Sequence, residues 1–307
     1  MHSKRSILEH PGAYAMLSGR SDAETAVFFV HGFTGDAVAT WIDFHGLIDQ
    51  MSDIASWWAT CDLYFYQYRT LSDNVAVLAS RFSQFLKEYF PTPPEMKLGR
   101  PSQECAQLVG QGSMSAFPVT SQYRSLILVG HSLGGVIIRQ SLVDEAIAEC
   151  AKSPGESDTT RQGITAANGC LLAAVRLFAP ASFGFEPARF PGYCYHLMME
   201  MPRLGRFLRP VVHANPLCED LQSGSHRLSQ LRQRTESLAM QHPWMHALRA
   251  HLLFGSREQM VYMDRYDCDP VYRIVENQDH RSVCKPTVYY SEPLGFVSYG
   301  IPRSASV

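Results

Sequence analysis

The sequence predicts an α/β fold in which a mostly parallel central sheet carries helices on both faces. Short apolar runs with the length of buried strands recur along the chain, and amphipathic helical patterns lie between them. A continuous apolar run is typical of a strand buried on both faces of a parallel sheet, and strands alternating with helices define the α/β class. We expect residues 1–307 to form one domain of this kind.

Six runs are expected to form the strands. Five are strongly apolar, and the sixth is weaker because polar residues interrupt it. In chain order the runs are residues 26–30, 63–66, 126–129, 173–178, 251–254 and 271–275.

Two helices are expected next to these strands. Apolar residues recur on one helical face from Val75 to Tyr89, with Ser72 as an N-cap and Pro91 as a stop. A second helix should follow residue 132 and continue to about Cys150, because the next residues, 152–155, read Lys-Ser-Pro-Gly.

Two segments interrupt the alternation of strands and helices. Residues 91–123 are rich in Pro, Gly, Ser and Gln, which predicts a surface excursion. Residues 183–247 combine helical spacing around Leu228 and Leu231 with a methionine-rich stretch at 195–201. We interpret this second segment as a helical cap over the active site; the alternative is an extra helical layer of the core with no role in catalysis.

Composition excludes several classes of function. Hydrophobic residues make up 46% and charged residues 18% of the chain, as in an ordinary globular protein, and a net charge of −2 provides no field to attract nucleic acid. No apolar run reaches the roughly 18 residues of a membrane span, and no secretory signal is recognised. Eight cysteines spread singly indicate reduced thiols, and hence a cytoplasmic protein. Because no residues have metal-ligand spacing, we expect no metal and no cofactor.

The motif with the clearest chemistry is Gly130-His131-Ser132-Leu133-Gly134. A Gly-x-Ser-x-Gly pattern alone is weak evidence, since a chain of this length contains one by chance about one time in ten. Here it directly follows a predicted strand and opens a predicted helix, which is the setting of a nucleophile elbow. The serine at such a tight turn is strained, and small neighbours are needed around it. Ser132 is therefore the candidate nucleophile.

A second motif, His31-Gly32-Phe33-Thr34-Gly35, follows the first strand. With the serine motif, it makes the chain resemble the α/β-hydrolase superfamily, in which a His-Gly pair ends a strand and the next backbone N–H helps to hold the oxyanion. The resemblance implies an α/β-hydrolase fold with a cap insertion, and an oxyanion hole formed by the N–H groups of Phe33 and Leu133. The chain lacks a His-Gly-Gly-Gly run, and the loop looks more like the intracellular lipase and inositol-deacylase-like branches.

A serine hydroxyl needs a histidine as base, and that histidine needs a carboxylate to fix its tautomer. In this superfamily the chain order is serine, acid, histidine. Of the twelve histidines, only His280 follows both a candidate acid loop and the last strand, in a stretch that resembles the superfamily's Asp-His loop. The alternatives that would invert the order are His242, His246 and His251.

The acid is assigned by the same resemblance. In the turn from Phe254 to Val261 a Gly ends the strand and Glu258 follows three positions later, where relatives carry an acidic residue. Aspartate is the more usual residue at that position. The rivals to Glu258 are therefore Asp264, Asp267 and Asp269.

These features predict a cofactor-independent serine hydrolase that cleaves a carboxylic ester or thioester with an apolar acyl part. We expect Thr34, Phe183 and Met260 to contact this small-molecule or lipid substrate. Acyl transfer or amide cleavage by the same triad, and a non-catalytic ligand-binding role, are the alternatives. Peripheral contact of the cap with a membrane surface also stays open, because Arg203, Arg206 and Arg209 lie within it. The sequence says nothing about the oligomeric state.

Overall fold

The computed structural model describes most of the chain. The residues that it describes are 2–7, 10–18, 23–33, 35–48, 57–58, 60–70, 73–92, 98–101, 122–152, 169–185 and 216–300.

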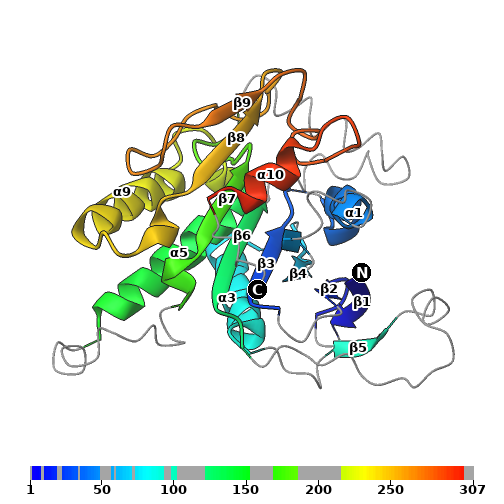
Figure 1. Ribbon diagram of the computed structural model, residues 1–307. Coiled ribbons are helices and arrows are strands. Elements are labelled where there is room, and N and C mark those ends of the chain that lie inside the picture. The colour runs from blue at the N-terminus through cyan, green and yellow to red at the C-terminus, as the bar shows by residue number, and fades with distance from the viewer. Residues whose placement is uncertain are drawn as a thin grey trace, which may run out of the picture.

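A nine-stranded sheet crosses this described part of the molecule in the order β5-β1-β2-β4-β3-β6-β7-β8-β9 (Figure 1). The six strands from β4 to β9 in this order are parallel to one another, and the predicted runs correspond to them. Their bounds are β4 (Cys61–Tyr66), β3 (Thr25–Val30), β6 (Ser125–His131), β7 (Ala174–Phe178), β8 (His251–Gly255) and β9 (Arg273–Val275). The predicted mostly parallel α/β sheet is thus confirmed.

The position of β3 decides where a ligand site can form. The chain leaves β3 for β4 on one side, and then returns to place β6 on the other side of β3. A crevice opens at the carboxyl ends of the strands where the winding direction reverses in this way. The residues that follow β3 and β6 are His31-Gly32-Phe33 and Ser132, so both sequence motifs lie at this switch point.

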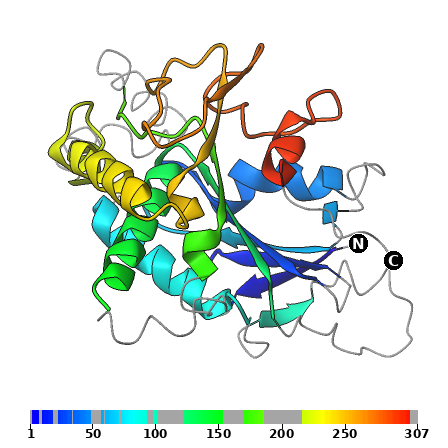
Figure 2. The same cartoon turned by 60° about the vertical axis from the view of Figure 1, so that its left-hand side comes forward.

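Helices cover both faces of the sheet. Figure 2 shows α1 (Ala37–Ile48) and α10 (Glu292–Ser298) on one face, and α3 (Val75–Tyr89), α5 (Leu133–Cys150) and α9 (His226–Gln241) on the other. Two short pieces, α8 (Pro216–Asp220) and the 3₁₀ helix η3 (His246–Leu248), flank α9, and another 3₁₀ turn, η2 (Gly169–Leu172), precedes β7. Large aromatic side chains fill the layer beneath α1: Phe29 packs against Trp41, Phe44 and Phe65 with ring centroids 4.7–5.2 Å apart.

The helix α3 begins two residues later than the sequence indicated. Its N-cap is Asn74, whose side chain accepts a hydrogen bond from the Val77 N–H at 3.0 Å, so the prediction of Ser72 as the cap was wrong. Asparagine and serine are about equally good N-caps, and the first apolar residue of the helical face, Val75, directly follows Asn74. The predicted end of α5 at Cys150 agrees with the structure.

Three strands were not predicted. The pair β1 (His2–Ile7) and β2 (Tyr14–Ser18) is antiparallel, and β2 continues the sheet by pairing antiparallel with β4. The strand β5 (Leu98–Pro101) pairs with β1 at the sheet edge, inside the segment 91–123 that was expected to be a surface excursion. Residues 102–121 of that segment lie outside the described part of the chain.

The segment 183–247 divides into a described and an undescribed part. Residues 186–215, with the methionine-rich stretch and the three arginines, lie outside the described residues. In the described part, α9 buries Leu228, Leu231 and Ala239 and lies beside α5 in the helical layer on the sheet. The helical spacing seen in the sequence thus corresponds to a layer helix, and a cap remains a prediction.

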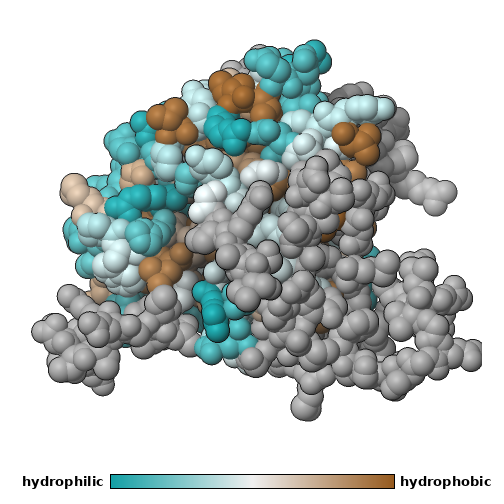
Figure 3. Space-filling model, in the orientation of Figure 1, coloured by the Kyte–Doolittle hydropathy of each residue, from teal (hydrophilic) through white to brown (hydrophobic). Residues whose placement is uncertain are grey.

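No helix in the described part of the chain is long and apolar enough to cross a membrane. On the face shown in Figure 3, apolar side chains outside the grey region form small separate patches among hydrophilic ones.

Candidate active site

Ser132 sits at the turn between β6 and α5 with a strained backbone. Its φ of 53° and ψ of −119° lie in a region that non-glycine residues rarely adopt. Three main-chain hydrogen bonds hold the turn: Ser132 N–H donates to Phe178 O at 3.0 Å, and Ser132 O accepts from Gly135 N–H at 3.0 Å and Ala181 N–H at 3.2 Å. The turn is therefore fixed both by its own helix and by the end of β7.

The glycines of the serine motif permit close packing of the backbone. A Cβ on Gly134 would come 2.2 Å from Val30 O and 2.6 Å from His31 O, so the first turn of α5 lies directly against the end of β3. A Cβ on Gly130 would come 2.8 Å from Gly135 N. No side chain fits at either position, which explains why the motif needs glycine on both sides of the serine.

Ser132, His280 and Glu258 form one chain of hydrogen bonds. The Nε2 atom of His280 lies 3.0 Å from Ser132 Oγ, and its Nδ1 lies 2.9 Å from Glu258 Oε2. All three residues are buried, with 2%, 4% and 9% of Ser132, His280 and Glu258 exposed. The structure thus brings together the three residues that the sequence assigned to nucleophile, base and acid.

Glu258 is held as a carboxylate. Burial alone would raise its pKa, but the hydrogen bond and charge of His280 lower it, and so do the N–H groups of Met260 and Val261, which donate to Oε1 at 2.7 and 3.1 Å. The net result is a pKa below the usual value of a glutamate. Oε1 of Glu258 therefore accepts hydrogen bonds from its own loop, and Oε2 is bonded to His280.

The rival acids have other partners. Asp269 is fully buried and forms an ion pair with Arg139 of α5 at 2.5 Å, while its other oxygen accepts from Ala250 N–H. The side chain of Asp267 is 85% exposed and lies 3.7 Å from Arg232. Asp264 is also exposed, at the edge of a pocket. None of these three carboxylates is bonded to His280 in the structure.

The rival histidines lie elsewhere. His242 caps the end of α9, where its Nε2 is 3.2 Å from Cys150 Sγ, and His246 begins η3. His251 is the first residue of β8, whereas the site lies at the other end of the parallel strands, and its ring packs against Tyr299.

The loop after β3 lies beside the serine. A Cβ on Gly32 would come 3.0 Å from Ser132 Cβ, which places the Gly32–Phe33 peptide next to Ser132, and Leu133 is the first residue of α5. His31 braces this loop: its Nδ1 bonds Gly32 O at 2.8 Å, and its ring stacks on Tyr68 at 4.1 Å. Burial lowers the pKa of His31 to about 4, so the ring is neutral. Thr34, expected to contact the substrate, lies outside the described residues.

His131, the residue before Ser132 in the serine motif, also belongs to the site. His131 is buried beside His280: its Nε2 lies 2.7 Å from the carbonyl oxygen of His280, and the centroids of the two imidazole rings are 4.9 Å apart. A single sequence carries no signal for this contact, because the partner is a main-chain atom 149 positions away.

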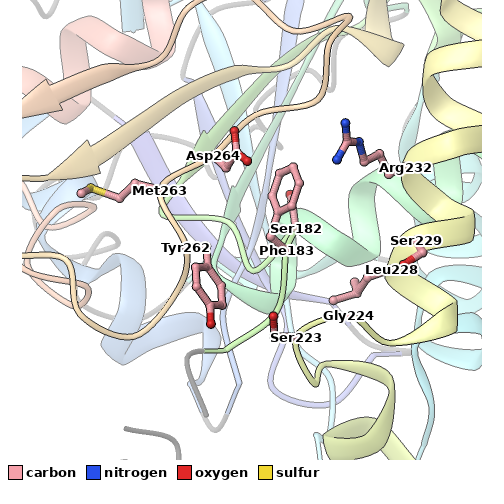
Figure 4. Close-up of a pocket in the computed structure, with 10 residues that line it drawn as sticks. All are labelled: Ser182, Phe183, Ser223, Gly224, Leu228, Ser229, Arg232, Tyr262, Met263 and Asp264. Atoms are coloured by element: carbon pink, nitrogen blue, oxygen red, sulfur yellow. The ribbon is translucent and has the colours of Figure 1, made fainter. Parts of the chain in front are cut away.

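A pocket of about 390 Å³ lies between α9, the turn at Ser223 and the loop after Glu258, and Ser132, Glu258 and His280 are not among the residues that line it (Figure 4). Phe183 forms part of its wall, with its ring 5.7 Å from that of Tyr266. Ser182, which also lines the pocket, directly follows Ala181, the residue that donates to Ser132 O. Met260, the other residue expected to contact substrate, is half-buried and is not among the residues lining this pocket.

Among the described residues no group of three or more His, Cys, Asp or Glu side chains is placed to hold a metal ion.

A mostly parallel sheet, helices on both faces and a strained serine between β6 and α5 are the features of the α/β-hydrolase fold that the sequence predicts, and the chain has that fold. No protein-family model and no curated protein sequence matches the chain.

Solved structures with a similar fold include several hydrolases. The mature lipase BlEst2 of Bacillus licheniformis matches with 15% identity and a TM-score of 0.45, over 89% of this chain and 91% of the lipase. The carboxylesterase CesB of Bacillus subtilis matches with 13% identity and a TM-score of 0.48, over 98% and 93% of the two chains. The phospholipase PlaB of Legionella pneumophila matches with 17% identity and a TM-score of 0.40, over 76% of this chain but only 39% of the phospholipase. These likenesses concern the fold alone.

Proposed function

We propose that the protein is a serine hydrolase that cleaves a carboxylic ester or thioester through an acyl-enzyme intermediate. The observation that carries the proposal is the buried chain from Ser132 through His280 to Glu258, with links of 3.0 and 2.9 Å. The chain of hydrogen bonds begins at Ser132, whose φ is 53°. Backbone strain of this kind is maintained by the surrounding structure and is found most often at active sites.

In the proposed acylation, His280 Nε2 accepts the hydroxyl proton as Ser132 Oγ bonds to the substrate carbonyl carbon, and the carbonyl π electrons move onto its oxygen. Two backbone N–H groups, of Phe33 and Leu133, stabilise this oxyanion, and each such donor is worth about 3 kcal/mol in the transition state. The carbonyl then re-forms, the bond to the leaving oxygen or sulfur breaks, and the leaving group takes the proton from His280.

Deacylation repeats these steps with water as the nucleophile. His280 takes a proton from water while the water oxygen bonds to the acyl carbon. His280 then gives that proton to Ser132 Oγ when the bond between Oγ and the acyl carbon breaks. In both halves Glu258 faces an imidazolium on His280. Its carboxylate fixes the tautomer with the proton on Nδ1 and stabilises the positive charge.

The pocket that reaches the site through Ser182, the residue after Ala181, is the proposed place for the apolar part of the acyl group. Phe183, Leu228 and Met263 give it apolar walls, and its volume of about 390 Å³ is in the range of small-molecule sites. Replacing Leu228 with a larger Phe should therefore shift the preference toward shorter acyl chains. An unchanged chain-length profile in a folded Leu228→Phe protein would remove this pocket from the proposal while leaving the triad in place.

The function is tested with a matched panel of chromogenic esters, thioesters and amides of increasing acyl length, using the wild-type protein and Ser132→Ala. We expect turnover of esters or thioesters by the wild type only, and added alcohol or amine acceptors would reveal acyl transfer. Equal turnover by Ser132→Ala would contradict the proposal. A stoichiometric adduct without turnover would instead indicate a binding protein.

For the compartment, we propose a reducing cytoplasm. No disulfide joins the six cysteines in the described part of the chain, and four of them, at positions 61, 170, 218 and 284, are buried.

A further inference from the structure

His131 lies at the end of β6, between two loops of the site. Its main chain ends β6 in register with Phe178, one residue before the nucleophile. On one side its Nε2 reaches the carbonyl oxygen of His280 at 2.7 Å. On another side its Nδ1 faces the loop after β3, since a Cβ on Gly32 would come 2.9 Å from that atom. One side chain thus contacts the loop of the base and the loop proposed to bind the oxyanion.

We propose that His131 is a positioning residue that sets the main chain of His280 at the correct distance from Ser132. This inference rests on the proposed function. Besides the Ser132–His280 bond, the bond from His131 Nε2 is a direct polar link between the end of β6 and His280. Because it acts on the carbonyl of His280, it restrains the residue's backbone, while Glu258 restrains its ring.

The chemistry of His131 suits this role. A carbonyl oxygen only accepts, so Nε2 of His131 must carry the proton and donate it. Burial, followed by the nearby His280, lowers the pKa of His131 to about 3, and the ring is therefore neutral at any pH near neutrality. A neutral donor holds the base loop without placing a second positive charge beside the imidazolium that forms on His280 during the reaction.

Two variants of similar polarity, His131→Gln and His131→Asn, test whether His131 positions His280 or only fills the space beside it. The amide nitrogen of glutamine is as many bonds from Cβ as the Nε2 of histidine, so His131→Gln can still donate to the carbonyl of His280. The amide nitrogen of asparagine corresponds to Nδ1, so His131→Asn cannot reach it. His131→Ala removes both the donor and the ring.

We expect His131→Asn and His131→Ala to lower kcat and the rate of fluorophosphonate labelling about 10- to 100-fold with KM nearly unchanged, because small displacements of a catalytic group are costly. His131→Gln should stay within about threefold of wild type. Proton NMR gives a second readout: the low-field resonance of the proton between His280 and Glu258 should persist in His131→Gln and shift or broaden in His131→Asn. Thermal unfolding identifies any variant that fails to fold. Among the folded variants, the difference in kcat between His131→Gln and His131→Asn tests the positioning role.

Equal activities of the folded Gln and Asn variants, whether both high or both low, would overturn the inference. If these variants behave alike while Ser132→Ala is inactive, the proposed function stands and only the role of His131 is wrong. If Ser132→Ala is as active as wild type, the proposed function fails, and the NMR resonance still shows whether His131 positions His280.

Discussion

Gly255 and Gln278 lie in such close contact that a Cβ on Gly255 would come 2.2 Å from the carbonyl oxygen of Gln278. Gly255 ends β8 and begins the turn that carries Glu258, whereas Gln278 precedes His280 by two residues. The N–H of Arg257 donates to the same carbonyl oxygen at 2.9 Å. The acid and the base are therefore adjacent because their two loops touch at a residue without a side chain.

Gly255→Ala should separate these loops. A methyl group cannot be accommodated at 2.2 Å from a main-chain oxygen, so the loops must shift and lengthen the bond between Glu258 and His280. We expect kcat to fall at least tenfold, since displacement of catalytic groups by about 1 Å can cost on the order of 10². The control is Gly295→Ala, because a Cβ at Gly295 meets nothing within 4 Å. Equal kcat values for the two variants would contradict the proposed contact.

Glu258→Gln should lower kcat about 10²- to 10⁴-fold, because the amide no longer stabilises the imidazolium and can hold the wrong tautomer. Asp267→Asn is the matched control, since the Asp267 side chain is 85% exposed, and it should leave kcat within about twofold. Steady-state kinetics of both proteins gives the comparison. A crippled Asp267→Asn beside an active Glu258→Gln would reverse the assignment of the acid.

Asp269→Asn should affect stability rather than chemistry. The carboxylate of Asp269 is paired with the buried guanidinium of Arg139, whose charge would be left uncompensated by an amide. Breaking a buried pair in this way costs about 3–5 kcal/mol in the free energy of unfolding. Urea unfolding measures this loss. A variant as stable as wild type would show that the pair contributes little to the fold.

Acid should destabilise the protein below a pH of about 6.5. In the unfolded chain His31 and His131 take up protons near their ordinary pKa of 6.5, but in the fold burial lowers their pKa values to about 4 and about 3. Since the unfolded state binds more protons, the free energy of unfolding rises with pH between about 4 and 6.5, by up to about 1.4 kcal/mol per pH unit for each histidine. His131→Gln should show a shallower slope in this range than wild type. Parallel slopes would contradict the neutral, buried state of His131.

The parallel strands and the candidate catalytic residues could be read from the sequence because each carries a local signal. A run such as Val27-Phe28-Phe29-Val30 is too apolar to be anything but buried, and the serine motif begins with the last two residues of β6. The Glu258 turn was recognised by its spacing from the end of β8. These features depend on residues close together in the chain.

Other features depend on partners far away in sequence. The β1 residues Ser3-Lys4-Arg5-Ser6 do not alternate as a typical strand does, and they become one because β2 and β5 pair with them on both sides. The interaction of His131 with the carbonyl of His280 leaves no mark on either residue type. The helix α9 shows the same limit, because an apolar helical face is compatible with a cap, as we predicted, and with a layer helix, and only its position beside α5 places it in the layer.

The central claim is that Ser132 is the nucleophile activated by His280. It is tested most directly by treating the wild-type protein and Ser132→Ala with a fluorophosphonate probe and locating the adduct by mass spectrometry of peptides. The structure leads us to expect a single adduct on Ser132 in the wild type, formed much more slowly in His280→Ala, and no adduct in Ser132→Ala. An adduct on another serine, or undiminished labelling of Ser132→Ala, would contradict the claim.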